Sequence, residues 1–356
     1  MNSEIEFYKW QTHDSKKLYR SIQDILNMNS LQFYMPFYSL YFYIHNKPKA
    51  NQKIDIRRNY YLKEVLEITK SRYYNSNMFL KGNIYNQSKN IITECEMFCK
   101  SIPILDPIHI INNNYNLVNH KNHHLPSNYN YNTFQKINDI NNTAYIDVLC
   151  SFLFGNLTYH KKSPSFPLYY GSVNGIGDYN YDLTEDYDDI KNDKCFNENI
   201  DKGFKLEIYV SDDEEVSDNS SEENSDKDEN SSEEDLDKDE NSSEENLDKD
   251  ENSSEENSDK ISNYNDPSFD DCIAKLLKIP IQLLFIEKLE GTLEDLLDED
   301  ITEEVLLSCI FQISFALTYL QKHFKFTHND LHINNVMFIK TENKYLYYKN
   351  NNRYYR

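Results

Sequence analysis

The stretch Phe326-Thr-His-Asn-Asp-Leu-His-Ile-Asn-Asn-Val-Met-Phe338 decides how this sequence is interpreted, because it combines histidine, aspartate and asparagine in one short loop. Its pattern is His-x-Asp-Leu-x-x-x-Asn, with His328, Asp330 and Asn335 at the defined positions. A carboxylate can accept the proton of a hydroxyl group, and an amide oxygen can coordinate a hard cation. We therefore expect Asp330 and Asn335 to serve one site. A polar loop without chemistry, joining a helix to a strand, is the alternative.

Elements of two kinds flank this loop. Apolar residues recur at three- and four-residue spacing from Leu306 to Phe324, which predicts a helix of about six turns. Its apolar stripe is wide, so we expect a core helix. Capping-box patterns at Thr292–Asp295 and Asp300–Glu303 predict the start of a short helix and of the long one. An apolar strand is expected after the loop, from Val336.

Short strands are predicted further upstream. The alternation of apolar and charged residues around Cys95, Met97 and Cys99 indicates a half-buried strand. Aromatic and β-branched runs at Phe166–Val173 and Phe204–Val210 indicate two more. The run Ile279–Glu287 is typical of a strand buried on both faces after its proline. The expected fold class is α+β with a small antiparallel sheet.

The loop, led by a long helix and followed by a strand, resembles the catalytic loop of the protein-kinase superfamily. The overall look of the chain is similar to kinase-like proteins of giant DNA viruses. The resemblance implies that Asp330 accepts or orients the proton of an attacking hydroxyl and that Asn335 binds a magnesium ion against the phosphates. It implies that His328 is structural, with its ring packed beneath the loop. ATP and Mg²⁺ are the implied cofactors.

The same resemblance assigns roles upstream of the loop. The segment Leu284–Leu293 looks like the last strand of an N-lobe, a hinge and the next helix, with the backbone of Glu287 to Leu289 facing an adenine ring. The segment Asn142–Leu149 resembles the regulatory helix, with Asp147 where a glutamate is usual. Lys100 is the candidate for the phosphate-binding lysine, at the end of the strand Met97–Lys100.

Several residues depart from the family pattern. Gly82 is the only glycine before Lys100, so no Gly-rich phosphate loop precedes that lysine. Phe98 stands where a small residue faces adenine, so either the assignment is off or the pocket is narrowed. Asn329 replaces the usual arginine and His332 the usual lysine. The loop is closer to those of choline and aminoglycoside phosphotransferases, and the substrate class stays open.

The largest departure follows Asn335, because the 21 residues after it contain no Asp-Phe-Gly. We expect an incomplete helical C-lobe and a catalytically impaired or dead pseudokinase. An incomplete lobe would expose apolar side chains of the helix ending at Phe324, which predicts a partner that covers them. The tyrosines of Tyr345–Tyr348 and Tyr354–Tyr355 would form an unsupported hairpin. An active serine/threonine-type or small-molecule phosphotransferase completed by another chain is one alternative.

An acidic interaction protein is the other alternative, and it rests on residues 211–260. They hold 24 Asp and Glu against 4 Lys, a net charge of −20. An eleven-residue unit, Asn-Ser-Ser-Glu-Glu-Asn/Asp-Ser/Leu-Asp-Lys-Asp-Glu, begins at Asn219, Asn230, Asn241 and Asn252. High charge with few apolar residues predicts a disordered insertion.

The rest of the sequence excludes several function classes. Outside the acidic run, 33 Lys and Arg balance 36 Asp and Glu, so no basic face for nucleic acid is expected. The six cysteines have no metal-site spacing, which is typical of free thiols in a reducing compartment. No signal peptide and no apolar run of about 18 residues are found, which argues against secretion and a membrane span. We expect a cytoplasmic protein, in the host cytoplasm or the virion if it is viral.

The expected domain organisation follows from these patterns. Residues 1–80 form an unassigned N-terminal extension and residues 81–210 a kinase-like N-lobe. Residues 211–260 are the acidic insertion, residues 261–290 the last N-lobe strand and hinge, and residues 291–356 the incomplete C-lobe.

Overall fold

The computed structural model describes residues 5–6, 12–34, 54–55, 57–71, 76–115, 117, 131–209, 271–299, 301–350 and 352–356. The chain divides into two compact units, one formed by residues 1–208 and 271–356, the other by residues 209–270. The second unit contains the acidic repeat. The prediction of a disordered insertion therefore lies outside the described residues.

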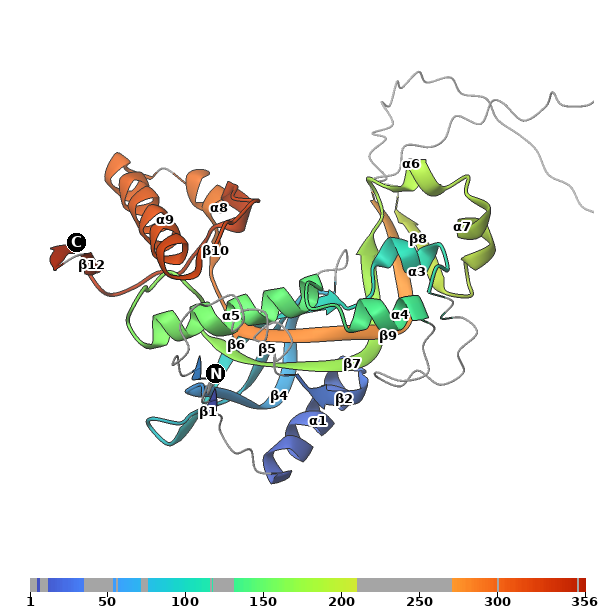
Figure 1. The fold of residues 1–356 in the computed structure, drawn as a ribbon, viewed down its shortest axis with the longest axis horizontal. Helices are drawn as coiled ribbons and strands as arrows, with labels where there is room; N and C mark the ends of the chain where they lie inside the picture. The colour runs from blue at the N-terminus through green and yellow to red at the C-terminus, as the bar shows by residue number, and fades with distance from the viewer. Residues whose placement is uncertain are drawn as a thin grey trace, which may run out of the picture. The chain divides into compact units, whose positions relative to one another are not determined.

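A seven-stranded sheet forms the centre of the first unit (Figure 1). Its strand order is β2-β7-β9-β6-β5-β4, and β8 also pairs with β9. Each neighbouring pair along this order is antiparallel, so the α+β fold class is confirmed. The strands are β2 (Asn29–Phe33), β4 (Tyr60–Ser71), β5 (Met78–Asn86), β6 (Ile91–Pro103), β7 (Tyr169–Asp182), β8 (Phe204–Tyr209) and β9 (Asp271–Glu287). The sheet thus draws on residues before position 80, and the boundary expected there falls within β5.

Strand β6 carries the alternation found in the sequence. Met97 and Cys99 are fully buried, whereas Phe98 and Lys100 between and after them are half-exposed. A strand turns successive side chains to opposite faces, so the apolar set points into a core. The half-buried strand predicted here is confirmed.

Strand β9 is longer than expected and lies between β6 and β7. Pro280 lies inside it, although proline cannot donate a ladder hydrogen bond. Two residues earlier Lys278 has a φ of 52°, and the register with β7 shifts between Gly177 and Tyr179. This bulge accommodates the proline in a strand that is otherwise buried on both faces.

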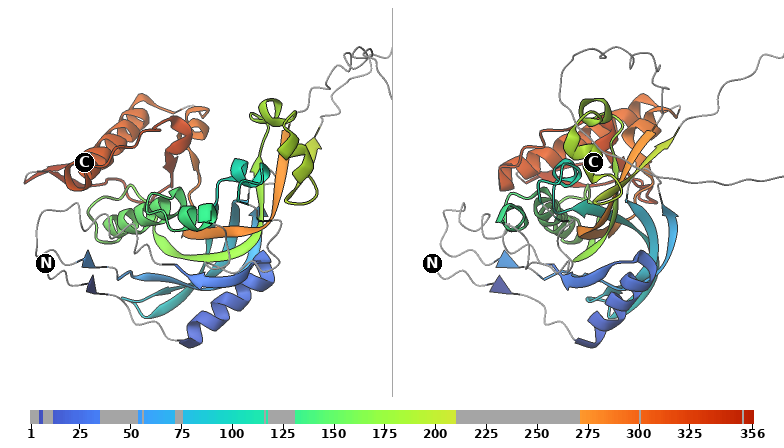
Figure 2. Two further views of the ribbon diagram at one scale, coloured as in Figure 1. Left: turned by 45° about the vertical axis from the view of Figure 1, so that its right-hand side comes forward. Right: turned by 90° about the vertical axis from the view of Figure 1, so that its right-hand side faces the viewer.

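Two helices cover opposite faces of the sheet (Figures 1 and 2). Helix α5 (Thr143–Tyr159) reaches the face of Lys100, which pairs with Leu284 of β9. Helix α1 (Thr12–Leu26) ends just before Met28, whose side chain contacts Gly175 on β7. Gly175 is the strand partner of Ile281 on β9, so Met28 lies on the face of Ile281. Ile281 and Leu284 are three positions apart and point to opposite faces. The sheet therefore has a core on each side.

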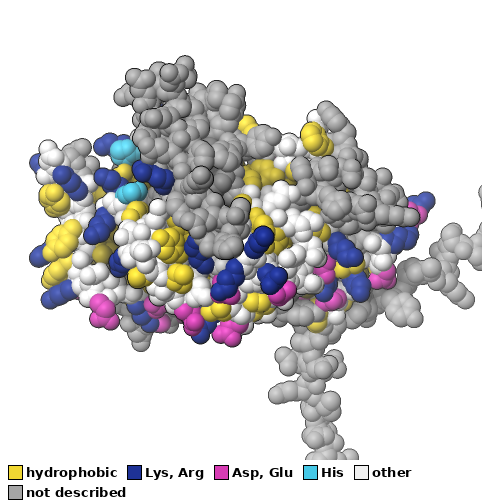
Figure 3. Space-filling model, turned by 90° about the horizontal axis from the view of Figure 1, so that it is seen from below, with side chains coloured by type: hydrophobic (Ala, Val, Ile, Leu, Met, Phe, Trp, Pro, Cys, Tyr) yellow, Lys and Arg dark blue, Asp and Glu magenta, His cyan; other side chains and the backbone are white. Residues whose placement is uncertain are grey.

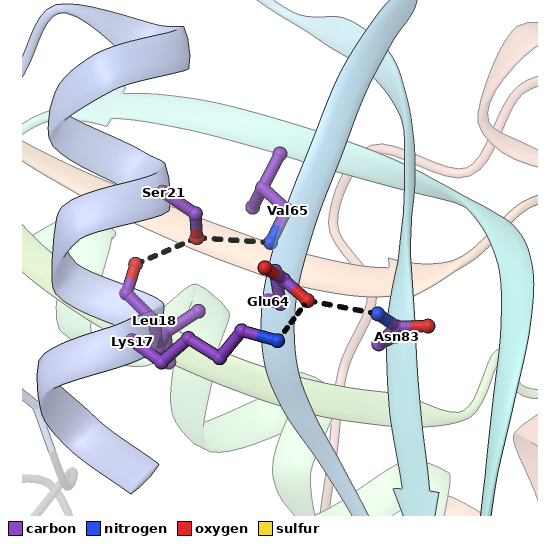
Figure 4. A network of polar contacts seen from close by, with 6 residues as sticks. All are labelled: Lys17, Leu18, Ser21, Glu64, Val65 and Asn83. Atoms are coloured by element: carbon purple, nitrogen blue, oxygen red, sulfur yellow. Dashed lines mark hydrogen bonds and ion pairs between the residues drawn. The ribbon is translucent and has the colours of Figure 1, made fainter. Parts of the chain in front are cut away.

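A polar network fixes α1 on β4 and β5 (Figure 4). The Lys17 ammonium lies 2.7 Å from the carboxylate of Glu64, which also accepts a hydrogen bond of 2.9 Å from the side chain of Asn83. The Ser21 hydroxyl accepts a hydrogen bond of 3.0 Å from the backbone N–H of Val65. Polar contacts thus fix the position of the helix, while its buried side chains supply the packing.

We expect Glu64→Gln to lower the free energy of unfolding at pH 7. The hydrogen bond from Lys17, helped by that from Asn83, holds the pKa of Glu64 below its ordinary value of 4.5, against the effect of burial. A lowered folded-state pKa stabilises the protein above pH 4.5, and this stabilisation is lost as the pH falls through the folded-state pKa. Urea unfolding at several pH values measures it, with the exposed Glu67→Gln as control. Parallel pH profiles for the wild type and Glu64→Gln would contradict this assignment.

Smaller elements complete the first unit. β1 and β3 pair in parallel, whereas β10 with β11 and β12 with β13 pair antiparallel. These elements are β1 (Ile5–Glu6), β3 (Ile54–Asp55), α3 (Pro107–Ile111), α4 (Tyr131–Ile137), α6 (Tyr187–Ile190), α7 (Lys194–Asn199), β10 (Gly291–Thr292), α8 (Leu293–Leu297), α9 (Glu303–Phe324), the 3₁₀ turn η2 (Ile333–Asn335), β11 (Met337–Phe338), β12 (Tyr348–Asn350) and β13 (Arg353–Tyr355).

Helix α9 is the predicted long helix, capped by Thr302 rather than by Asp300. Its expected core position is wrong, because Ala316 and Leu320 are its only buried residues. Leu307 is 57% exposed, so the predicted exposure of apolar side chains on this helix is confirmed. By length and composition alone, α9 is also the one helix in the described ranges that could cross a membrane.

The predicted C-terminal hairpin is present as β12 and β13. Tyr348 is buried, and its ring centroid lies 4.7 Å from that of Phe315 and 5.2 Å from that of Phe311 on α9. The expectation that the hairpin is unsupported is therefore wrong on the side that faces α9.

Candidate functional site

Asn335 organises the loop that follows α9. Its side-chain NH₂ donates hydrogen bonds to the carboxylate of Asp330 at 2.8 Å and to the Asp330 carbonyl at 3.0 Å. The same nitrogen lies 2.8 Å from Nε2 of His332. The 3₁₀ turn at η2 closes the loop so that residues five apart meet. Asp330, His332 and Asn335 therefore form one constellation.

This constellation is open to solvent. The Asp330 side chain is 77% exposed, so its carboxylate can be approached by a substrate hydroxyl. Because the NH₂ of Asn335 faces Asp330, the carbonyl oxygen of the same amide is turned away from that carboxylate. A single amide oxygen is far from the six oxygen ligands that Mg²⁺ requires, so this loop alone does not form a complete magnesium site. Among the described residues no cluster of three His, Cys, Asp or Glu could hold a metal ion.

Aromatic contacts join the start of the loop to α5. The ring centroid of Phe326 lies 5.3 Å from that of Phe154 on α5 and 6.1 Å from that of His328. Nδ1 of His328 is buried and has no hydrogen-bond partner in the described part of the chain. The His328 ring is thus packed at the base of the loop.

The exit of the loop is joined to the segment after β9. Strand β11 pairs with β10, and the backbone N–H of Glu290 donates a hydrogen bond of 2.9 Å to the carbonyl of Phe338. The backbone N–H of Leu293 donates another, of 2.6 Å, to the carbonyl of Val336. The predicted hinge and the predicted catalytic loop are therefore adjacent.

Lys100 and Asp147 form an ion pair, with Nζ 2.5 Å from Oδ2. Lys100 lies on β6, the third strand of the meander β4-β5-β6, and Asp147 lies on α5. The Lys100 side chain is 44% exposed, so its ammonium can contact a ligand while it remains paired. No hydrogen bond or ion pair among the described residues joins this pair to Asp330.

The connection between β4 and β5 lies beside Lys100. The backbone N–H of Ser101 donates a hydrogen bond of 3.0 Å to the side chain of Asn77. The connection, residues 72–77, contains no glycine, and residues 72–75 lie outside the described ranges. Gly82 lies within β5, opposite Val65 and Cys95, and takes no part in a loop.

Phe98 shares the strand face of Lys100 with a second ring that the sequence did not reveal. The centroid of Phe79 on β5 lies 5.4 Å from that of Phe98. The ammonium of Lys288 lies 5.5 Å from the centroid of Phe79 and 2.7 Å from the carboxylate of Glu96. Partners from β5 and from the segment after β9 meet here through strand register, which no local sequence signal gives.

Glu287 joins the end of β9 to the backbone of Leu168. Its backbone N–H donates to the carbonyl of Leu168 at 2.9 Å, and its carboxylate accepts from the N–H of Leu168 at 3.0 Å. Burial raises the pKa of the Glu287 carboxyl above its ordinary range. In the described part of the chain no hydrogen bond engages the backbone N–H of Leu289, so of the two expected hinge residues Leu289 retains a backbone donor for a ligand.

Comparisons with known proteins give no family for this chain. No family model matches it, and no curated protein or solved structure matches it.

Proposed function

We propose that residues 1–356 form a protein-kinase-like unit that binds ATP but transfers phosphate poorly or not at all. The ion pair between Lys100 and Asp147 carries this proposal. Protein kinases hold the phosphates of ATP with a lysine on the third strand of the sheet, and an acidic residue on the next helix positions that lysine. Here the lysine is on the third strand of a meander and the acid is on α5, the long helix that lies between β6 and β7.

The position of Phe154 supports the same proposal. Asp147 and Phe154 are seven residues apart, so they lie on nearly the same side of α5, about 10 Å apart along its axis. Asp147 holds Lys100, and Phe154 packs on Phe326 at the base of the loop. One side of α5 thus contacts both halves of the proposed site.

Each residue then has a chemical role. Lys100 would neutralise phosphate charge, and the free backbone N–H of Leu289 would donate to an adenine ring. Asp330 would orient the attacking hydroxyl, while Asn335 holds the Asp330 carboxylate with its NH₂ and offers its carbonyl oxygen to Mg²⁺. The rings of Phe79 and Phe98 would narrow the space left for the base.

The proposed impairment concerns the magnesium ion. Kinases hold Mg²⁺ on the phosphates with the aspartate of Asp-Phe-Gly, and residues 336–356 contain no such motif. Charge neutralisation at the transferring group supplies much of the rate in this chemistry. Kinases hold magnesium with this aspartate and with an asparagine of the catalytic loop. Here only the asparagine, Asn335, would be present.

The exposed side of α9 favours a second candidate, an active phosphotransferase whose remaining lobe comes from another chain. Leu307 and Ile310 are both at least half exposed, at 57% and 50%. A covering lobe would bury these side chains and could supply the missing magnesium ligand.

Binding and turnover of the 356-residue chain separate these candidates. We expect saturable binding of a fluorescent ATP analogue with Mg²⁺, and no transfer of radiolabelled γ-phosphate to protein, choline or aminoglycoside acceptors. Asp330→Asn should bind the analogue as well as the wild type does, and the exposed Asp189→Asn is the matched control. Absence of nucleotide binding would refute the kinase-like assignment. Turnover that disappears in Asp330→Asn alone would refute the impairment and support the second candidate.

A further inference from the structure

A groove of about 470 Å³ lies between α9 and the hairpin β12-β13. Its walls include Phe311, Phe315 and Tyr355. None of its lining residues belongs to the 328–335 loop, to α5 or to the central sheet. It is therefore separate from the proposed nucleotide site, and the inference below does not depend on that proposal.

The groove is elongated along the helix. Its lining residues on α9 begin at Phe311, continue with Phe315 four residues later and end at His323. Residues at this spacing form one continuous strip on a helix surface. A strip of several turns suits a peptide segment better than a compact small molecule.

Basic side chains are among the lining residues of the groove. Lys322 and His323 lie in the last turn of α9, and Lys349 lies on β12. Lys349 lies 5.4 Å from the ring centroid of Tyr354. No ion pair with a described carboxylate involves any of the three, and no Asp or Glu lines the groove. The charges of Lys322 and Lys349 are thus uncompensated within the part of the protein that the structure describes.

We propose that this groove binds an acidic peptide that carries isolated leucines. The leucine side chains would pack on the Phe311 and Phe315 rings, and the flanking carboxylates would pair with Lys322 and Lys349. The sequence around Leu236 and Leu247, Glu-Glu-Asp-Leu-Asp-Lys and Glu-Glu-Asn-Leu-Asp-Lys, has this chemistry. A nucleic acid is a poorer match, because it needs a longer basic stripe than three side chains provide.

The test uses the full chain and a labelled synthetic peptide with the sequence of residues 230–251, followed by fluorescence anisotropy at low salt. We expect saturable binding that weakens about tenfold or more in Lys322→Glu/Lys349→Glu. The two lysines that attract the carboxylates of the peptide are then replaced by glutamates that repel them. Lys344→Glu, an exposed lysine outside the groove, should bind as the wild type does. A peptide with serine in place of both leucines should bind markedly less tightly.

Three results would overturn the proposal. The first is an absence of saturable peptide binding both by the full chain and by a variant without residues 211–260, which holds no competing copy of the peptide. The second is an equal loss in Lys344→Glu, which would indicate non-specific charge attraction. The third is tighter binding of a thymidine oligonucleotide than of the peptide, which would assign the groove to nucleic acid. Circular dichroism of each variant checks that a loss of binding is not a loss of fold.

Discussion

We expect that replacing Lys100 with methionine weakens the proposed nucleotide binding of a protein that still folds. Methionine keeps most of the length and apolar volume of the lysine side chain but has no charge, so β6 keeps its packing while the phosphates lose their cation. The Lys100 ammonium is half-exposed, so its removal leaves no buried cavity. We expect the dissociation constant for an ATP analogue to rise on the order of 100-fold, as for loss of a charge-assisted contact.

Variants of Asp147, the ion-pair partner of Lys100, test the role of Lys100 more specifically. Asp147→Glu should keep the analogue bound, because a longer carboxylate still reaches the Lys100 ammonium. Asp147→Asn should weaken binding less than Lys100→Met does, because it removes the positioning group and leaves the cation. Lys205→Met, on the exposed side of β8, is the matched control. If Lys100→Met and Lys205→Met bind the analogue alike, Lys100 does not contact phosphate.

The largest effect on stability is expected at Phe285 in β9. Its side chain is fully buried, and its strand partners are Cys99 on β6 and Gly171 on β7. Gly171 has no side chain that could move into the space left by a smaller residue. Phe285→Ala should therefore cost about 3–5 kcal/mol of the free energy of unfolding, from lost burial and an unfilled cavity.

Chemical denaturation monitored by circular dichroism measures this loss. Ile92→Ala is the matched control, because that side chain is 61% exposed and should change the free energy of unfolding by less than about 0.5 kcal/mol. A loss below about 1 kcal/mol in Phe285→Ala would mean that β9 is not at the centre of the core.

Local patterns predicted the parts of the fold that local physics determines. The alternation around Met97 indicated β6, the three- and four-residue spacing indicated α9, and the capping box at Thr292 indicated α8, where both capping hydrogen bonds are present. The surface in Figure 3, where basic, acidic and apolar side chains are mixed, agrees with the near-neutral charge found outside the acidic run.

Long-range partners account for what the sequence could not give. β4 and β5 belong to the sheet although they begin before residue 80, because β5 pairs with β6 and β4 pairs with β5. Phe79 contacts Phe98 because the two residues are partners in the pairing of β5 with β6, and no sequence pattern around Phe79 predicts this contact. The core position expected for α9 failed for a related reason. An apolar stripe records which side chains favour burial, but not whether the described residues supply a surface to bury them.

The seven-residue separation of Asp147 and Phe154 has a mechanical consequence. A helix is stiff over two turns, so any rotation or sliding of α5 moves the Lys100 pair and the base of the 328–335 loop together. A ligand that draws Lys100 toward its phosphates would therefore bias the position of the loop. That ligand and a partner bound to the loop would change each other's binding affinity by the same factor. If both proposed sites bind their ligands, α5 would couple the occupancy of one site to that of the other.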